Sequence, residues 1–124
     1  MTPPRVTYTA RMSCLFCRIV AGEVPASKVY EDDRLVAFND LHPQAPMHVL
    51  IVPREHVATV NDLSPAHDDL VGAMVRRGAE IAKAGGFSHS GYRTVFNCNA
   101  DAGQTVFHLH LHVLGGRTFT WPPG

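Results

Sequence analysis

The hydrophobic positions of this 124-residue chain change their period along its length, and this change predicts both helices and strands. Between Ser64-Pro65, a typical helix start, and Gly85-Gly86, a typical helix end, apolar residues recur three and four positions apart. We therefore predict one long helix here, with an apolar stripe that needs a sheet to cover. The stripe consists of Leu70, Val71, Met74, Val75, Ile81 and Ala82.

Short apolar runs bounded by turn residues predict the strands. They cover residues 28–30, 35–39, 49–52, 92–97 and 106–114. A shorter helix is predicted over 14–21, and loops over 41–47 and 99–103. Because strands precede and follow one main helix without regular alternation, the pattern predicts an α+β fold with a mostly antiparallel sheet.

Histidines alternate with leucines at residues 108–112 (HLHLH). Successive side chains of a strand point to opposite faces, so the three imidazoles share one face, with about 6.5–7 Å between neighbours two positions apart. Leu109, Leu111 and Val113 share the other face and are predicted to pack on the helix. A solvated polar face would be the simplest interpretation, but three titratable rings together indicate chemistry.

Two kinds of chemistry suit three imidazoles on one face: metal binding, and nucleophilic attack on phosphorus or a carbonyl group. The segment 101–105, just upstream, contains a glycine at 103, where a ligand can approach the backbone, and a hydroxyl at Thr105. Backbone N–H groups beside a histidine can hold a phosphate without net basic charge. The residues themselves leave both kinds of chemistry open.

Cys14 and Cys17 form a Cys-x-x-Cys pair with three interpretations: half of a zinc site, a thioredoxin-like redox pair, or two idle cysteines. The redox interpretation requires the pair to lie between a strand and a helix of a βαβ unit, which the pattern does not predict. A zinc site needs two further ligands, and eight histidines are available. Cys98 is expected to be a small buried residue without a role.

The composition narrows the class of protein. Hydrophobic residues make up 45% and charged residues 18% of the chain, as is typical of a single globular domain. Eleven Lys+Arg balance eleven Asp+Glu, so the basic excess of most nucleic-acid and membrane-surface binders is missing. No apolar run approaches the roughly eighteen residues of a membrane span.

The N-terminus and the cysteines bear on localisation. The first thirteen residues contain Arg5 and Arg11 but no apolar core, so we expect a flexible tail over residues 1–12 rather than a secretory signal. An odd, sparse set of three cysteines suits a reducing compartment. We therefore expect a cytoplasmic protein without nucleic-acid or membrane partners.

Residues 108–114 (HLHLHVL) match the histidine triad, His-x-His-x-His-x-x with apolar x, in full. The stretches 14–56 and 91–117 and the terminal WPPG match the Hint branch of the histidine triad (HIT) superfamily, the histidine-triad nucleotide-binding proteins. The chain therefore resembles a Hint protein over a single HIT domain, residues 13–124.

The resemblance implies a HIT-like fold: a five-stranded, mostly antiparallel sheet with one long and one short helix. It also implies a homodimer in which two sheets join into one of ten strands. The implied activity is that of a purine nucleoside phosphoramidase, which cleaves the bond between nitrogen and an adenosine or guanosine 5′-phosphate through a nucleotidyl-histidine. The implied ligand is a purine nucleotide, and this chemistry needs no metal.

The resemblance further implies roles for individual residues. His110 matches the nucleophile, His112 the phosphate-binding acid, and His48 the residue that buttresses the nucleophile's backbone. Thr105, where the family usually has serine, matches the hydroxyl that binds the phosphate or leaving group. Asp40 matches the carboxylate that holds the ribose hydroxyls, and Asn97 and Gly103 match contacts with the phosphate. Trp121 matches a residue that reaches toward the site of the partner subunit. The implied base pocket consists of Phe16, Ile19, Phe38, Leu41 and Leu50.

Bacterial members that resemble this chain hold structural zinc through the cysteine pair, the histidine of a P-x-x-H segment and the first triad histidine. By position these ligands are Cys14, Cys17, His56 and His108, which predicts one closed tetrahedral site per subunit. Many members of the branch lack the cysteines, so neither the fold nor the activity requires zinc.

Other functions stay open beside the phosphoramidase. They are a dinucleoside polyphosphate hydrolase, a nucleotide-binding regulatory protein, and a zinc-stabilised interaction module. The WPPG ending favours the phosphoramidase over the polyphosphate hydrolase. Without the resemblance, Asp40 would be interpreted as a turn residue and the residues of the base pocket as ordinary core positions.

Overall fold

The computed structural model describes residues 13–124; the tail expected over residues 1–12 lies outside this range. The described chain contains five strands: β1 (Lys28–Glu31), β2 (Leu35–Asn39), β3 (Met47–Pro53), β4 (Tyr92–Val95) and β5 (Leu111–Gly115). Its α-helices are α2 (Leu15–Val20) and α3 (Asp68–Ala84). Short 3-10 helices cover Val60–Asp62, Pro65–His67 and Ala100–Ala102.

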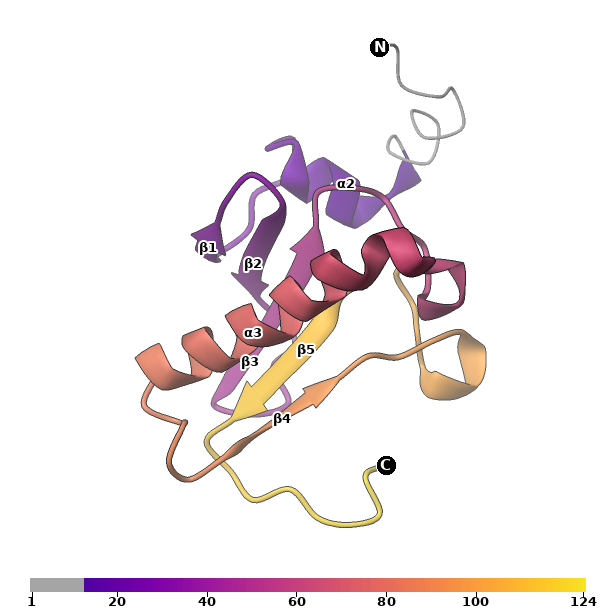
Figure 1. Cartoon of the computed structure of the whole chain (residues 1–124). Coiled ribbons are helices and arrows are strands. Elements are labelled where there is room, and N and C mark those ends of the chain that lie inside the picture. The colour runs from indigo at the N-terminus through magenta and orange to yellow at the C-terminus, as the bar shows by residue number, and fades with distance from the viewer. Residues whose placement is uncertain (1–12) are drawn as a thin grey trace.

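The strands form one sheet in the order β1-β2-β3-β5-β4, and every neighbouring pair is antiparallel. One long helix, α3, lies across one face of this sheet, as Figure 1 shows. The shorter α2 packs on the other face through a separate apolar cluster. The predicted α+β fold with a five-stranded sheet and two unequal helices is confirmed.

Strands β2 and β3 are mostly apolar on both faces because a helix covers each face of the sheet. Alternate residues point to opposite sides, so each strand contributes to two apolar clusters. The cluster under α3 contains Leu35, Ala37, Val49 and Ile51. The cluster under α2 contains Val36, Phe38, Leu50 and Val52.

Helix α3 buries four positions at intervals of four residues: Leu70, Met74, Gly78 and Ala82. Gly78 allows close packing, because a Cβ atom there would lie 3.2 Å from Cγ2 of Val113. The predicted stripe is correct for Leu70, Met74 and Ala82 but wrong for Val75, which is 46% exposed. A search for large apolar residues overlooks a glycine that faces the sheet.

The predicted helix end at Gly85 is correct, but the predicted start at Ser64-Pro65 opens a 3-10 helix and the α-helix itself begins at Asp68. Ser64 precedes a 3-10 turn at Pro65–His67 that continues into α3, and its backbone N–H donates to Nδ1 of His67 over 2.9 Å. At the other end, the N–H of Gly85 donates to the carbonyl of Ile81. Gly86 then adopts a φ of 87°, a left-handed conformation that favours glycine.

The last predicted strand is partly wrong. The pattern predicts a strand over 106–114, but the ladder begins only at Leu111, which pairs with Ile51. Continuing this register would place Pro53 opposite Leu109, and proline has no N–H to donate to a ladder. The N–H of Leu109 instead donates to the carbonyl of Val57 over 2.6 Å. Strand β4 is shorter than predicted as well, ending at Val95 opposite His112.

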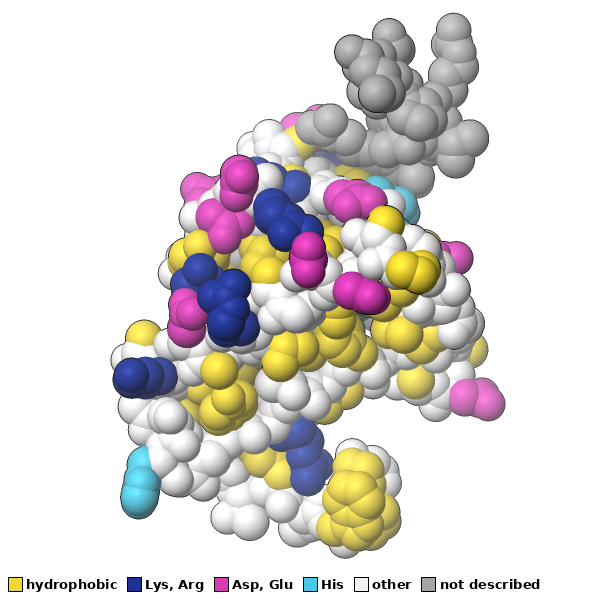
Figure 2. Space-filling view, viewed as in Figure 1, with side chains coloured by type: hydrophobic (Ala, Val, Ile, Leu, Met, Phe, Trp, Pro, Cys, Tyr) yellow, Lys and Arg dark blue, Asp and Glu magenta, His cyan; other side chains and the backbone are white. Residues whose placement is uncertain are grey.

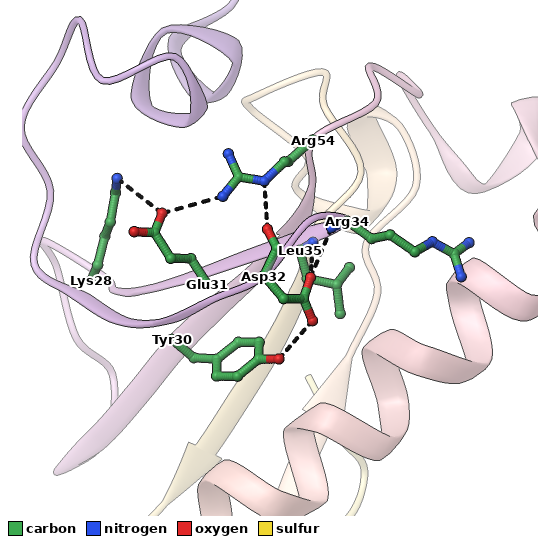
Figure 3. Close-up of polar contacts among 7 residues, drawn as sticks. All are labelled: Lys28, Tyr30, Glu31, Asp32, Arg34, Leu35 and Arg54. Carbon is green, nitrogen blue, oxygen red and sulfur yellow. Dashed lines mark hydrogen bonds and ion pairs between the residues drawn. The ribbon is translucent and has the colours of Figure 1, made fainter.

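Asp32 fixes the turn between β1 and β2, as Figure 3 shows. Its Oδ1 accepts hydrogen bonds from the backbone N–H groups of Arg34 and Leu35, over 2.8 and 2.7 Å. Its Oδ2 accepts one from the hydroxyl of Tyr30 over 2.6 Å. Because Nε of Arg54 donates to the Asp32 carbonyl over 2.7 Å, the same turn holds the end of β3.

Positive and negative side chains are interspersed on the face that carries α3 (Figure 2), in keeping with the zero formal net charge. Within residues 13–124, no helix combines the length and apolar character needed to cross a bilayer.

Candidate active site

A cavity of about 330 Å³ lies on the α2 side of the sheet. Its walls come from α2, the loop that follows it, the loop after β2, and the segment that leads into β5. The cavity brings together most of the residues expected to be catalytic or to bind substrate. They are Phe16, Ile19, Phe38, Asp40, Leu41, Leu50, Thr105, His110 and His112.

His110 presents one nitrogen for chemistry. Its Nδ1 lies 2.7 Å from the carbonyl oxygen of His108. Because a carbonyl only accepts, Nδ1 carries the proton and Nε2 keeps its lone pair. Burial lowers the pKa of His110, although the His108 carbonyl and Asp40 act in the opposite direction, so the neutral, nucleophilic form is favoured.

His112 presents the opposite tautomer. The N–H of Gln44 donates to Nδ1 of His48 over 3.0 Å, so Nε2 of His48 carries a proton. That Nε2 lies 2.9 Å from Nδ1 of His112 and donates to it. The remaining proton of neutral His112 is therefore on Nε2, which is buried without a hydrogen-bond partner among the described residues. Burial, and then the neighbouring histidines, lower the pKa of His112 to about 4.

Asp40, His48 and His112 bring one ligand atom each within 4.8 Å of one another, which raises the question of a metal ion. The hydrogen bonds argue against it. A metal at Nε2 of His48 would require a proton on Nδ1, and that proton would face the N–H of Gln44. We interpret this group as a hydrogen-bonded relay that ends at His112.

Asp40 is held at the rim of the cavity by its own loop. Its Oδ1 accepts from the N–H of His42 over 2.8 Å, and its Oδ2 lies 3.4 Å from Nε2 of His48. The side chain is partly exposed, which leaves carboxylate lone pairs for a ligand.

The segment 99–106 supplies the hydroxyl beside the two histidines. Buried Gln104 holds this segment, since its Oε1 accepts from the N–H of Asn99 and its Nε2 donates to the carbonyls of Ala58 and Val106. Gly103 adopts a φ of 85° just before it. Thr105 is exposed and lines the cavity. The sequence singled out Gly103 and Thr105 but gave no indication that Gln104 anchors them.

Four expected residues do not line the cavity: His48, Asn97, Gly103 and Trp121. His48 is buried behind His112 and contacts that ring, whereas the resemblance associated it with the backbone of the nucleophile. Asn97 is half-buried beyond the end of β4. Trp121 is 83% exposed in the C-terminal segment.

A cluster of two cysteines and two histidines lies beside the cavity, and the resemblance had singled out the same four residues. Nδ1 of His108 lies 3.4 Å from Sγ of both Cys14 and Cys17, and Nδ1 of His56 lies 3.2 Å from Sγ of Cys17. All four ligand atoms lie within 4.8 Å of one another. Tetrahedral zinc with ordinary bond lengths separates sulfur from nitrogen by about 3.5 Å, which these distances approach.

The protonation of His108 also suits a metal. Its Nε2 lies 2.7 Å from the carbonyl of Pro53 and must donate to it, so Nδ1 faces the sulfurs with a lone pair. Burial lowers the pKa of His108 to about 4, which keeps the ring neutral. The residues present therefore fit a zinc ion. Cys98, expected to be buried, is half-buried and lies outside this group.

Several groups that orient or line the site could not be predicted from the sequence. The carbonyl of Pro53, the N–H of Gln44 and the side chain of Gln104 orient the site, and the loop 24–27 and His42 line the cavity. Backbone donors and acceptors are present at almost every residue, so no pattern of side chains marks them.

The chain is similar to known proteins over most of its length. A family model described as "Scavenger mRNA decapping enzyme C-term binding" matches residues 13–119. A protein of Escherichia coli strain K12 named purine nucleoside phosphoramidase is 45% identical over 103 residues, which is 83% of this chain and 87% of that protein. Protein HitA of Neisseria gonorrhoeae is 44% identical and covers 83% of this chain and 95% of its own.

Solved structures give the same result. The crystal structure of a HIT family hydrolase from Legionella pneumophila has a TM-score of 0.89 and 51% identity, covering 90% of this chain and all of that one. A Zn-bound histidine triad family protein from Mycobacterium smegmatis has a TM-score of 0.77 and 36% identity, covering 86% and 77% of the two chains. With the triad, the cavity and these relatives in agreement, the chain belongs to the histidine triad family and is a nucleotide hydrolase of that family.

Proposed function

We propose that this protein hydrolyses the P–N bond of purine nucleoside 5′-phosphoramidates through a nucleotidyl-histidine intermediate. One observation carries the proposal: His110 and His112, neighbours in one cavity with ring centroids 4.9 Å apart, are held in opposite tautomers. One ring offers a lone pair for attack on phosphorus, and the other an N–H that can donate a hydrogen bond to the charged phosphate. The name of the Escherichia coli relative supports this substrate class.

The first step joins His110 to the nucleotide. Nε2 of His110 attacks the α-phosphorus, the P–N bond breaks, and the amine leaves with a proton that its nitrogen takes up from solvent. An amine is a poor leaving group unless it is protonated, so the nitrogen must carry this proton before the P–N bond breaks. The Nε2–H of His112 donates a hydrogen bond to the phosphate. Thr105 adds a hydroxyl to the same cavity.

The second step releases the nucleotide. A water oxygen attacks phosphorus and the water gives up a proton to solvent, while the Nε2–H of His112 stays hydrogen-bonded to the phosphate. The bond from phosphorus to Nε2 of His110 breaks, and a nucleoside monophosphate leaves. Splitting one difficult displacement into two is the usual advantage of covalent catalysis.

The rest of the cavity suits a nucleoside. Phe16 and Phe38 pack edge to face with ring centroids 5.4 Å apart, and with Ile19 they form an apolar wall for a base. Asp40 at the rim can accept hydrogen bonds from two vicinal ribose hydroxyls. Asn97 and Gly103 remain candidates for the phosphate, although neither lines the cavity.

The test uses adenosine 5′-phosphoramidate as substrate and His110→Ala as variant. We expect wild type to release AMP and the variant to lose turnover by at least about 10³-fold while its Kd for AMP changes little. A radiolabelled nucleotidyl adduct should be trapped on wild type alone, and exposed His89→Ala serves as matched control. Unchanged turnover in His110→Ala, or faster hydrolysis of a diadenosine polyphosphate than of the phosphoramidate, would overturn the proposal.

We further propose that the four-residue cluster holds one structural zinc ion per chain. Its ligands are Cys14, Cys17, His56 and His108, and the Zn-bound Mycobacterium smegmatis neighbour supports the assignment. The protein would supply all four ligands of the ion, and the ion would connect α2 to the segment before β5. Neither histidine that faces the substrate belongs to this set.

Metal analysis of the purified protein tests the zinc site. We expect one zinc per chain in wild type and in Cys98→Ala, and none in the Cys14→Ala, Cys17→Ala double variant. Zinc that survives the double substitution would contradict the assignment.

A further inference from the structure

One aromatic side chain, Phe16, connects the Cys-x-x-Cys pair to the candidate nucleophile. Phe16 lies between Cys14 and Cys17 at the start of α2, and its ring lines the nucleotide cavity. The Phe16 ring centroid lies 5.0 Å from that of His110, at an interplanar angle of 85°, and 6.0 Å from that of His108. Any change that joins the two sulfurs therefore alters the turn that holds a wall of the active site.

A second connection runs through the backbone. Nδ1 of His108 lies 3.4 Å from both sulfurs, and the carbonyl of the same residue accepts the Nδ1 proton of His110 over 2.7 Å. The cysteine pair thus contacts the residue that fixes the tautomer of the nucleophile. Two independent paths link the same two thiols to His110.

Small solutes can reach Cys14, the first cysteine of the pair, from outside the nucleotide cavity. A separate cavity of about 420 Å³ is lined by Cys14, His56, Ala58 and Phe107 among others. It shares Leu15, Thr105 and Val106 with the nucleotide cavity. Cys14 is 9% exposed, and the N–H of Cys17 donates to its sulfur over 3.4 Å.

We propose that Cys14 and Cys17 are a redox modification site that controls nucleotide binding. A peroxide oxidises the pair: the two thiols give up two protons and two electrons, an S–S bond forms, and the peroxide is reduced to two molecules of water (water and an alcohol for an organic peroxide). The sulfurs, within 4.8 Å of each other, must close to about 2.05 Å. Cys17 then withdraws from His56 and His108, and a zinc ion held by the cluster loses its two sulfur ligands.

The consequence for the active site rests on the function proposed above. Pulling the sulfurs together tightens the turn around Phe16 and removes its present packing against Phe38 and His110. We therefore expect the disulfide form to bind AMP about tenfold more weakly than the reduced form. Reduction with added zinc reverses the change.

The experiment treats the full-length protein with hydrogen peroxide and follows three quantities. Peptide mapping locates the disulfide, a zinc-sensitive dye measures released metal, and calorimetry gives the Kd for AMP. We expect a Cys14–Cys17 disulfide with a mass loss of about 2 Da, release of bound zinc, and a weakened Kd that dithiothreitol with zinc restores.

Two cysteine variants control the experiment. Cys98→Ser, which keeps the pair, should respond like wild type, and Cys14→Ser should keep its Kd for AMP on exposure to peroxide. Absence of a Cys14–Cys17 disulfide, or a disulfide with an unchanged Kd, overturns the proposal. If Cys14→Ser does not fold, mapping and binding in Cys98→Ser decide alone. If the reduced protein does not bind AMP, the proposed function fails, while the mapping still decides whether the pair is a modification site.

Discussion

Each triad histidine takes its chemical character from what lies at its second nitrogen. His108 donates to the carbonyl of Pro53 and turns a lone pair to the cysteines, whereas His110 donates to the carbonyl of His108 and keeps a lone pair on Nε2. His112 accepts from His48 and keeps a proton on Nε2. In the proposed function, three identical side chains of one motif therefore serve as a zinc ligand, a nucleophile and a hydrogen-bond donor.

The titration of His112 tests this account at one atom. We expect its ring to stay neutral at pH 6 and to titrate at about 4, because burial and the neighbouring histidines oppose the charged form. Measuring ring resonances by NMR between pH 8 and pH 3 checks this. A His112 pKa near the ordinary 6.5 would contradict it.

The same shift has a consequence for stability. The folded pKa of His112 lies below its unfolded value, so between pH 6.5 and 4 the unfolded chain binds more protons than the folded one. The contribution of His112 to the free energy of unfolding therefore falls as the pH is lowered through this window. Urea unfolding at pH 7.5, 6 and 5 should show decreasing stability.

We propose that His48 positions His112 through the hydrogen bond between their rings. Substituting His48→Phe keeps a buried ring of similar size but removes the donor, so we expect kcat to fall about 10²-fold with a small change in the Kd for AMP. Exposed His89→Phe provides the control. Equal losses in kcat and in AMP binding would indicate a disrupted cavity instead of a lost hydrogen bond.

At the scale of elements, sequence patterns located most helices and strands but not their exact lengths. The 3-10 turn that begins after Ser64 and the helix end at Gly85 follow local rules of capping, which a sequence carries in full. The start of β5 depends on what lies across the sheet, since Pro53 is remote in sequence from Leu111. Tertiary partners of this kind are invisible to a local pattern.

The candidate site divides in the same way. Residues with unusual chemistry, such as His110 and the cysteine pair, could be singled out from the sequence through a motif. The residues that orient them act through backbone groups or buried amides, as Gln104 does, and their types are too common to be informative. The contact of His48 with His112 and the tautomers of His110 and His112 depend on spatial neighbours, so they could not be derived from the sequence.

The turn between β1 and β2 gives a prediction at this scale. Removing the carboxylate in Asp32→Ala leaves two backbone N–H groups and the Tyr30 hydroxyl without their acceptor, so we expect a loss of about 1–2 kcal/mol of stability. Chemical denaturation measures it. The exposed neighbour Asp33→Ala should change stability by less than about 0.5 kcal/mol. Equal effects of the two substitutions would show that the turn does not depend on Asp32.

At the scale of the whole molecule, the sheet ends on β4, which pairs only with β5 within the described chain. An unpaired edge is a template for another strand, and a two-fold axis would let β4 of two copies meet. The ten-stranded sheet implied by the resemblance would follow. The C-terminal segment, with Trp121 exposed, would then lie within reach of the partner subunit.

Light scattering of the intact protein tests the dimer. We expect twice the chain mass of 13.6 kDa at micromolar concentration, and slow hydrogen exchange over β4 that becomes fast on dilution to the monomer. A single-chain mass at all concentrations would contradict the dimer and would leave Trp121 without a role in a second site.

The interruption of the sheet beside Pro53 has a wider consequence. In an uninterrupted ladder, main-chain carbonyls near this point would be occupied by neighbouring strands; here those of Pro53 and His108 are left to accept from imidazoles instead. A local defect in regular structure thus supplies the acceptors that distinguish the first two histidines of the motif. Designers who straighten such a region for stability should expect a firmer scaffold and a weaker enzyme.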